Sequence, residues 1–102
     1  MSSVTILFHV RVRRDRRDDL MSALVDVARL SREEDLCLGY DSYVTDSSET
    51  DILVVQDWET MEAYEAHNRR AYVSSLFERF EPDLLEPARR TILAPINETA
   101  SL

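Results

Sequence analysis

The sequence predicts an α+β domain in which a four-stranded antiparallel sheet carries its helices on one face. Residues 4–12 alternate between apolar and other side chains, which is the period of a strand with one buried face. Two longer segments repeat apolar residues at helical spacing. The two strand-like runs between those segments are joined by a short polar turn, so they are expected to pair as a hairpin. The resulting order, β-α-β-β-α-β, is that of ferredoxin-like domains.

The N-terminal part supplies the first strand and the first helix. The strand face expected to meet the helices consists of Val4, Ile6, Phe8, Val10 and Val12, and the other face of Thr5, Leu7, His9 and Arg11. Asp15 is expected to cap a helix that runs to about Glu34. The apolar stripe of this helix is expected to contain Leu20, Leu24, Val27 and Ala28.

The hairpin and the second helical segment follow. Strands are expected at residues 37–45 and 51–58, with the turn DSSET between them. Thr60 is expected to cap the next helix, which breaks near residues 68–70. Helical spacing then resumes through Val73, Leu76, Phe77 and Phe80.

The C-terminal part completes one domain. Pro82 and Pro87 limit the stretch between them to a short helical turn. Residues 88–94 are expected to form the last strand, followed by a polar tail at 95–102. A chain of 102 residues suits a single domain spanning 1–102, with its folded core at about 4–94.

Composition excludes several classes of site. The net charge of −8 opposes a phosphate backbone, so nucleic-acid binding is not expected. The chain has no Lys and a single Gly, which excludes Schiff-base chemistry, a Walker-type phosphate loop and a glycine-rich dinucleotide loop. Its single Cys, Cys37, cannot form an internal disulfide or a thiolate zinc cluster. No apolar run is long enough for a membrane span, and no signal peptide is recognisable, so a cytoplasmic protein with a reduced thiol is expected.

The sheet face without helices needs a cover. The residues expected on it from the first strand are a mixture of apolar and polar side chains, His9 among them. A homodimer that packs this face against the same face of a second copy is the simplest solution, because a twofold axis brings the same patch of both subunits into contact. His9 and His67, the only two His residues, are then on different sides of the sheet, so a metal centre built on both is not expected.

Two stretches carry a resemblance to a known family. EEDLCLGYDSY covers the entry to the second strand, and ILVVQDWETMEAYEAH covers the third strand and the helix after it. In order and spacing they resemble the antibiotic biosynthesis monooxygenase domain family, and the resemblance extends over roughly residues 4–94. The matching residues are Cys37, Leu38, Gly39, Tyr40, Trp58, Glu59, Glu62, Ala63, Ala66 and His67.

The resemblance implies a dimeric α/β barrel with a ligand cavity between sheet and helices. Some members of this family oxygenate polyketide phenols without metal or cofactor, others degrade haem, and others act on small signalling molecules. The positions that hold an Asn, a proximal His and a helix Trp in haem-degrading members correspond here to Phe8, Leu76 and His67, so haem is disfavoured. Tyr72 stands where many relatives have a second His, so a mechanism with two His residues is not expected.

His67 is the candidate catalytic residue, and it has a packing alternative. A His titrates near neutral pH and suits proton transfer with a phenol or enol, but a helix His can also be a packed side chain. We expect Trp58 and His67 to line one cavity, because strand alternation sends Trp58 toward the helices and small residues flank His67 on a helical stripe. That stripe consists of Ala63, Tyr64, His67 and Ala71. On this basis, His67→Ala should abolish turnover and change stability by only about 1 kcal/mol.

The other expected substrate contacts surround His67. Trp58 and Tyr72 are expected to orient a substrate oxygen, each with packing as the alternative role. The remaining expected contacts are Tyr64, Asn68 and Phe8, and the alternative for Asn68 is a surface position at the helix break. Tyr40 and Tyr43 fall on opposite faces of their strand, so at most one of them is expected to face the cavity.

These expectations lead to one leading hypothesis. The chain is expected to be a monooxygenase that needs no organic cofactor or metal, uses molecular oxygen as co-substrate and acts on a small aromatic or enolisable molecule. Two alternatives remain open: a non-catalytic domain that binds or senses a small molecule, and an isomerase of a small carbonyl signalling compound. The expected partners are a small-molecule substrate and a second copy of the chain, without nucleic acid or membrane.

Overall fold

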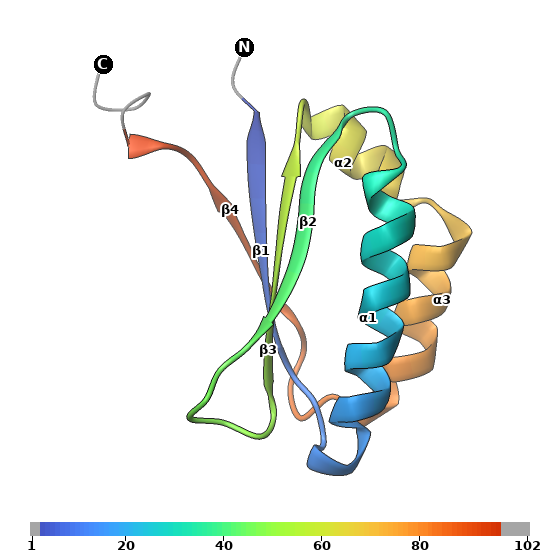
Figure 1. Cartoon of the computed structure of the whole chain (residues 1–102), viewed down its shortest axis with the longest axis vertical. Coiled ribbons are helices and arrows are strands. Elements are labelled where there is room, and N and C mark those ends of the chain that lie inside the picture. Colours follow the sequence, from blue (N-terminus) through green and yellow to red (C-terminus); the bar gives the residue numbers. More distant parts are fainter. Residues whose placement is uncertain (1–2, 97–102) are drawn as a thin grey trace.

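The computed structural model describes residues 3–96, and within them the predicted order of elements is confirmed. The helices form one layer against one face of the sheet (Figure 1). In chain order the elements are β1 (Val4–Arg11), the 3₁₀ turn η1 (Arg14–Arg16), α1 (Arg17–Arg32), β2 (Cys37–Val44), β3 (Asp51–Trp58), α2 (Met61–Asn68), α3 (Ala71–Phe80), the 3₁₀ turn η2 (Glu81–Asp83) and β4 (Arg89–Leu93).

The sheet order is β2-β3-β1-β4, and all neighbouring strands are antiparallel, as expected for a ferredoxin-like fold. The register decides which side chains reach the helix side. Phe8 of β1 lies opposite Val54 of β3, and Tyr40 of β2 lies opposite Gln56 of β3. Because paired residues point to the same face, Phe8, Tyr40 and Gln56 all project toward the helices.

Alternation along β3 anchors the core. Its residues Ile52, Val54, Gln56 and Trp58 are buried, whereas the residues between them are half-buried on the opposite face. α1 covers this surface with the predicted residues Leu20, Leu24, Val27 and Ala28. A smaller cluster, made of Ile6, Trp58, Ala63 and Tyr64, packs under α2. Phe8 packs against both clusters, so the two join at the middle of β1.

The predicted cap of the first helix is wrong. α1 begins at Arg17, and its N-cap is Arg16, which makes no side-chain capping hydrogen bond. Asp15 lies one residue before this N-cap, in η1, where its carboxylate accepts a hydrogen bond of 2.8 Å from Arg13. The chain therefore enters α1 through a 3₁₀ turn that the apolar pattern does not reveal, because η1 buries no side chain.

The predicted cap and break of the second helical segment are confirmed. The Thr60 hydroxyl accepts a hydrogen bond of 3.1 Å from the backbone N–H of Ala63. The helix ends at Asn68, and a separate helix starts at Ala71. This break changes the direction of the side chains that follow it, including that of Tyr72.

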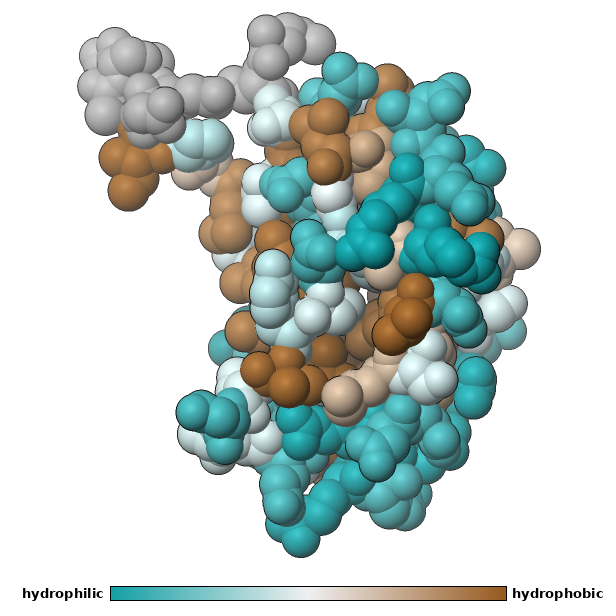
Figure 2. Space-filling model, in the orientation of Figure 1, coloured by the Kyte–Doolittle hydropathy of each residue, from teal (hydrophilic) through white to brown (hydrophobic). Residues whose placement is uncertain are grey.

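The face of the sheet opposite the helices is uncovered, as predicted (Figure 1). On it, Leu7 lies opposite Val55 and His9 lies opposite Leu53. Tyr43 of the edge strand β2 is on this face and is 54% exposed. In the view of Figure 2, hydrophilic side chains cover most of the helical side on the right, and apolar side chains gather along the sheet on the left. Among residues 3–96, no helix is long and apolar enough to cross a membrane.

Candidate functional site

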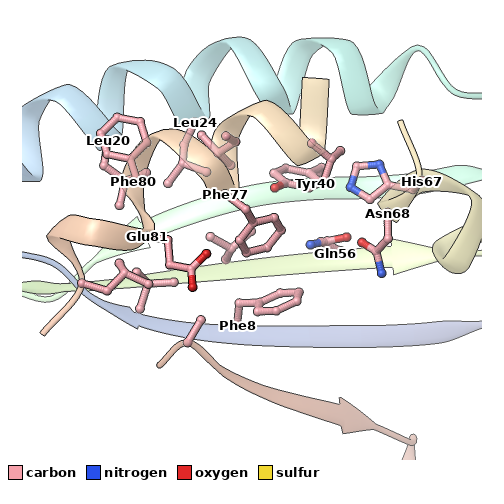
Figure 3. Close-up of a pocket in the computed structure, with 16 residues that line it drawn as sticks. Phe8, Leu20, Leu24, Tyr40, Gln56, His67, Asn68, Phe77, Phe80 and Glu81 are labelled. Atoms are coloured by element: carbon pink, nitrogen blue, oxygen red, sulfur yellow. The ribbon is translucent and has the colours of Figure 1, made fainter. Parts of the chain in front are cut away.

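A cavity lies between the helix layer and the sheet, and His67 and Asn68 stand at one end of it (Figure 3). The space that the centre of a water molecule can occupy inside it is about 60 Å³. Its walls come from β1, β2, β3, all three α-helices and the segment after α3. The lining residues are Phe8, Val10, Leu20, Leu24, Tyr40, Val54, Gln56, His67, Asn68, Val73, Leu76, Phe77, Phe80, Glu81, Leu84 and Ala88.

His67 is held by packing on three sides. It lies in the last turn of α2, and its side chain is 1% exposed. The centroid of its ring is 4.6 Å from that of Trp58, 5.8 Å from that of Tyr40 and 5.9 Å from that of Tyr72. Three aromatic neighbours at these distances fix the orientation of the imidazole, so its two nitrogens face different surroundings.

One of these nitrogens is engaged by a carboxylate. Nδ1 of His67 lies 2.9 Å from Oε2 of Glu34, which follows the last turn of α1. The hydroxyl of Tyr72 donates to the same Glu34 oxygen. The guanidinium of Arg70 lies 3.3 Å from the other oxygen, Oε1. Glu34 therefore stands at the centre of a small network, and both hydrogen bonds that the His67 ring makes within residues 3–96 are at Nδ1.

The charges of this pair follow from burial and hydrogen bonding. Burial lowers the pKa of His67 below its ordinary value of 6.5, and this outweighs the hydrogen bond and charge of Glu34, which act in the opposite direction. Burial alone would raise the pKa of Glu34, but hydrogen bonds from His67 and Tyr72 and the nearby positive charge lower it overall. Near neutral pH the pair is thus a carboxylate beside a neutral imidazole.

The tautomer of that imidazole is set by the same contact. An ionised carboxylate only accepts hydrogen bonds, so Nδ1 of His67 must carry the proton. Nε2 is then the unprotonated nitrogen, with a free lone pair. A His that lines a cavity and holds its other nitrogen against Glu34 is therefore equipped to accept a proton from a ligand.

Two amides lie beside His67 at the same end of the cavity (Figure 3). The indole N–H of Trp58 donates to Oε1 of Gln56 over 3.0 Å, which fixes which way this buried amide is turned. The NH₂ group of Gln56 is consequently the part left to donate toward the cavity. Asn68, the last residue of α2, brings a second amide to the same end.

The rest of the cavity is almost entirely apolar. Phe8 and Phe77 lie across from each other with ring centroids 6.4 Å apart. Tyr40 brings a hydroxyl group to the cavity wall. Burial raises the pKa of Tyr40, so this hydroxyl group stays neutral and can donate a hydrogen bond. This arrangement suits a flat apolar molecule with an oxygen at the His67 end.

The expected site residues divide into two groups. His67, Asn68 and Phe8 line the cavity, and Tyr40, not Tyr43, is the strand-two Tyr that faces it. The expectation that Trp58 also lines the cavity is wrong. The indole is buried behind His67, where it contacts the imidazole ring and orients Gln56.

Tyr64 and Tyr72 are also absent from the cavity wall. Tyr64 lies one turn before His67 and packs in the small cluster beyond the end of the cavity, with its hydroxyl 3.5 Å from Arg90. The helix break turns Tyr72 toward α1, where it contacts Glu34 and lies 3.3 Å from the Ser31 hydroxyl. For the same reason Ala71 is exposed and does not share the stripe that contains His67.

The reason for expecting a small stability change in His67→Ala, that a cavity-lining ring makes few packing contacts, is wrong, and the size of the change stays a prediction. A ring that is 1% exposed among aromatic neighbours leaves a hole when it is removed. The substitution also takes one hydrogen-bond donor from Glu34, whose side chain is only 11% exposed. Both effects make His67 a structural as well as a chemical element of the site.

Metal ligands do not gather here. Within residues 3–96, no three side chains of His, Cys, Asp or Glu lie close enough together to hold a metal ion. Phe8 and Leu76, the positions compared with haem-degrading relatives, both line the cavity with apolar side chains. Cys37 is a half-buried thiol whose pKa is raised by burial.

Two participants, Glu34 and Gln56, were not predicted from the sequence. Glu34 is one of several acidic residues after the first helix and lies 33 positions before His67. Gln56 sits on the buried face of β3, where the alternation pattern predicts an apolar residue. A polar residue at a strand position that should be buried was the one available sign, and it pointed to Gln56 only.

Comparison with known proteins agrees with this fold. Rv0793 from Mycobacterium tuberculosis superposes with a TM-score of 0.85 at 23% identity, over 92% of this chain and 95% of that chain. PA3566 from Pseudomonas aeruginosa gives a TM-score of 0.83 at 20% identity, over 93% and 95%. A structure described as an antibiotic biosynthesis monooxygenase gives 0.85 at 14% identity, over 90% and 97%. At these identities the likeness shows the shared fold alone.

The sequence itself identifies the family. No curated protein matches the chain. The family model described as antibiotic biosynthesis monooxygenase, however, matches residues 3–79, which is most of the described structure. The chain, with its ferredoxin-like fold and its cavity between sheet and helices, belongs to the antibiotic biosynthesis monooxygenase family.

Proposed function

We propose that this protein is a monooxygenase that acts on a small aromatic or enolisable molecule without a metal or organic cofactor. Membership of the family supports a monooxygenase-like activity. The observation that carries the specific proposal is the buried Glu34–His67 pair, which leaves Nε2 of a neutral imidazole free at the edge of an apolar cavity.

The first step is removal of a proton from the substrate. Nε2 of His67 accepts the proton of a phenol, or of a carbon next to a carbonyl group, and the resulting imidazolium is stabilised by the Glu34 carboxylate. The amides of Gln56 and Asn68 donate hydrogen bonds to the substrate oxygen, where negative charge develops. A general base of this kind contributes about 10²- to 10⁴-fold to the rate.

The second step uses the electron-rich anion that the first step creates. The anion passes one electron to dioxygen, and the two radicals combine to form a peroxide anion. Protonation of this anion by the His67 imidazolium and loss of water leave a new carbonyl group. For a methylene compound such as anthrone, one CH₂ and one O₂ give one C=O and one H₂O. The apolar walls exclude water from the intermediates.

We include a homodimer in this proposal. The uncovered sheet face carries an apolar strip of Leu7, Leu53 and Val55 between polar side chains, and Tyr43 extends it at the edge. A second copy packed on this face would bury the strip. Sedimentation at low micromolar concentration should then show about twice the chain mass of 11.8 kDa. A monomer at that concentration would contradict the dimer.

Oxygen uptake by metal-free protein tests the reaction. Anthrone and simple hydroquinones, each corrected for uncatalysed oxidation, should support uptake that His67→Gln abolishes. His9→Gln is the matched control, because His9 lies on the opposite face of the sheet beside Asp51 and should leave uptake unchanged. Exchange of substrate protons with solvent deuterium but no oxygen uptake would indicate an isomerase, and binding without either would indicate a sensing domain.

A further inference from the structure

Glu81 stands at the opposite end of the cavity from His67 (Figure 3). Its carboxylate turns toward the space between Phe8 and Phe77. Among the described residues that line the cavity, it is the one acidic residue, and none of them is Lys or Arg. No ion pair or side-chain hydrogen bond within residues 3–96 involves this carboxylate, in contrast to Asp83 two residues later, which pairs with Arg13 and Arg16.

A second negative feature coincides with Glu81. α3 ends at Phe80, and Glu81 is its C-cap. The last turn of a helix presents carbonyl groups without intrahelical partners, so its C-terminus carries partial negative charge and favours a cation. Two guanidinium groups, of Arg16 and Arg79, lie over the ring of Phe80, but neither lines the cavity. Arg16 is already paired with Asp83 at 2.9 Å.

From these features we infer that the cavity selects a phenol that carries a positively charged amine at the end away from its hydroxyl group, and that Glu81 is the residue that selects it. The hydroxyl group lies against His67, the ring lies along the wall formed by the tilted Phe8–Phe77 pair, and the ammonium group lies beside Glu81. The aromatic walls favour such a ligand further, because ring faces attract cations. This inference rests on the proposed function, which places the reacting oxygen at the His67 end.

The same features disfavour an anionic ligand. His67 is neutral near pH 7, so the lining offers no cation to compensate a carboxylate or phosphate. The whole chain has a net charge of −8, which repels anions before they reach the cavity. A phenol with a carboxylate tail should therefore bind more weakly than a neutral one.

Binding of three phenols of similar length tests this inference without turnover. The probes are tyramine, para-propylphenol and para-hydroxyphenylpropionate, which carry a positive, a neutral and a negative tail. Trp58 is the only Trp and its indole contacts His67, so its fluorescence reports occupancy of that end of the cavity. Tyramine should bind about two- to fivefold more tightly than para-propylphenol, as expected for a partly solvated charge pair, and the anion more weakly than both.

Two variants assign the preference to Glu81. Glu81→Gln should bind tyramine and para-propylphenol equally well. Glu78→Gln, which removes an exposed carboxylate of α3 that does not line the cavity, should keep the preference. Equal binding of the two phenols by the unaltered protein, no binding of any probe, or a preference that survives Glu81→Gln would each overturn the inference. Oxygen uptake without a charge preference would refute this inference alone, and a charge preference without uptake would refute only the proposed reaction.

Discussion

Replacing Glu34 with Gln should slow the reaction but leave the affinity of the cavity for its ligand nearly unchanged. The substitution keeps the shape of the side chain and removes its charge. Glu34 does not line the cavity, and it acts on the substrate only through Nδ1 of His67 at 2.9 Å. The amide can still accept from Nδ1, but it no longer stabilises the imidazolium that forms when the substrate gives up its proton.

The size of the effect follows from this contact. A hydrogen bond to a charged partner contributes about 1.5–3 kcal/mol. Loss of that contribution from the charged state alone corresponds to a fall in kcat of about 10- to 150-fold. The affinity for a phenol that is bound but not turned over should change little, because the groups that contact it remain in place.

The pH profile separates this role from a merely structural one. The hydrogen bond and charge of Glu34 raise the pKa of His67 against the effect of burial. Without them the pKa of His67 falls further, so the acid limb of kcat/KM should move to lower pH in Glu34→Gln. Glu33→Gln, at the exposed neighbouring position, is the control and should match the unaltered protein. An unchanged rate and an unchanged acid limb in a folded Glu34→Gln protein would refute the assigned role.

Three further predictions concern stability. His67→Ala should lower the free energy of unfolding by about 2–4 kcal/mol in urea titrations, because it removes a packed ring and a partner of Glu34, and a change below about 1 kcal/mol would contradict this packing. Thermal stability should fall as the pH drops below 6.5, the ordinary pKa of a His, because of His67. It should fall further below pH 4.5, the ordinary pKa of a Glu, because of Glu34. The sign follows because both groups have lower pKa values in the folded protein, so the unfolded chain binds more protons on acidification; a melting temperature that stays constant over this interval would contradict it. Thr60→Ala should cost about 1 kcal/mol through loss of the hydrogen bond to Ala63, whereas an unaltered melting temperature would mean that the cap contributes nothing.

The fold could be predicted from the sequence because its signals are local. Alternation in β1 and β3, helical spacing in α1 and α3 and the Thr60 cap each occupy a few consecutive residues. The exception is Asp15, a good capping residue placed in a 3₁₀ turn instead. The Asp15 side chain accepts a hydrogen bond from Arg13 instead. The apolar pattern that predicts α1 does not predict the turn before this helix.

The site could be predicted only in part, because its contacts join distant positions. His67 stood out as a His on a helix face beside small residues, and the cavity does reach it. The break after Asn68 was expected, but a break in sequence does not give the direction of the next helix, and that direction sends Tyr72 to Glu34. Nothing local shows that Glu34 meets His67, since their contact depends on how the end of α1 packs beside α2.

The protonation state of His67 tests the central claim most directly, and it requires no substrate. Nitrogen-15 NMR of the imidazole rings distinguishes the two neutral tautomers from the cation, and only His9 must be separated from it. We predict a neutral His67 with the proton on Nδ1 at neutral pH, and a pKa below 6.5. A His67 that is cationic at neutral pH, or that carries its proton on Nε2, would contradict the account, because Nε2 could not then accept a proton from the substrate.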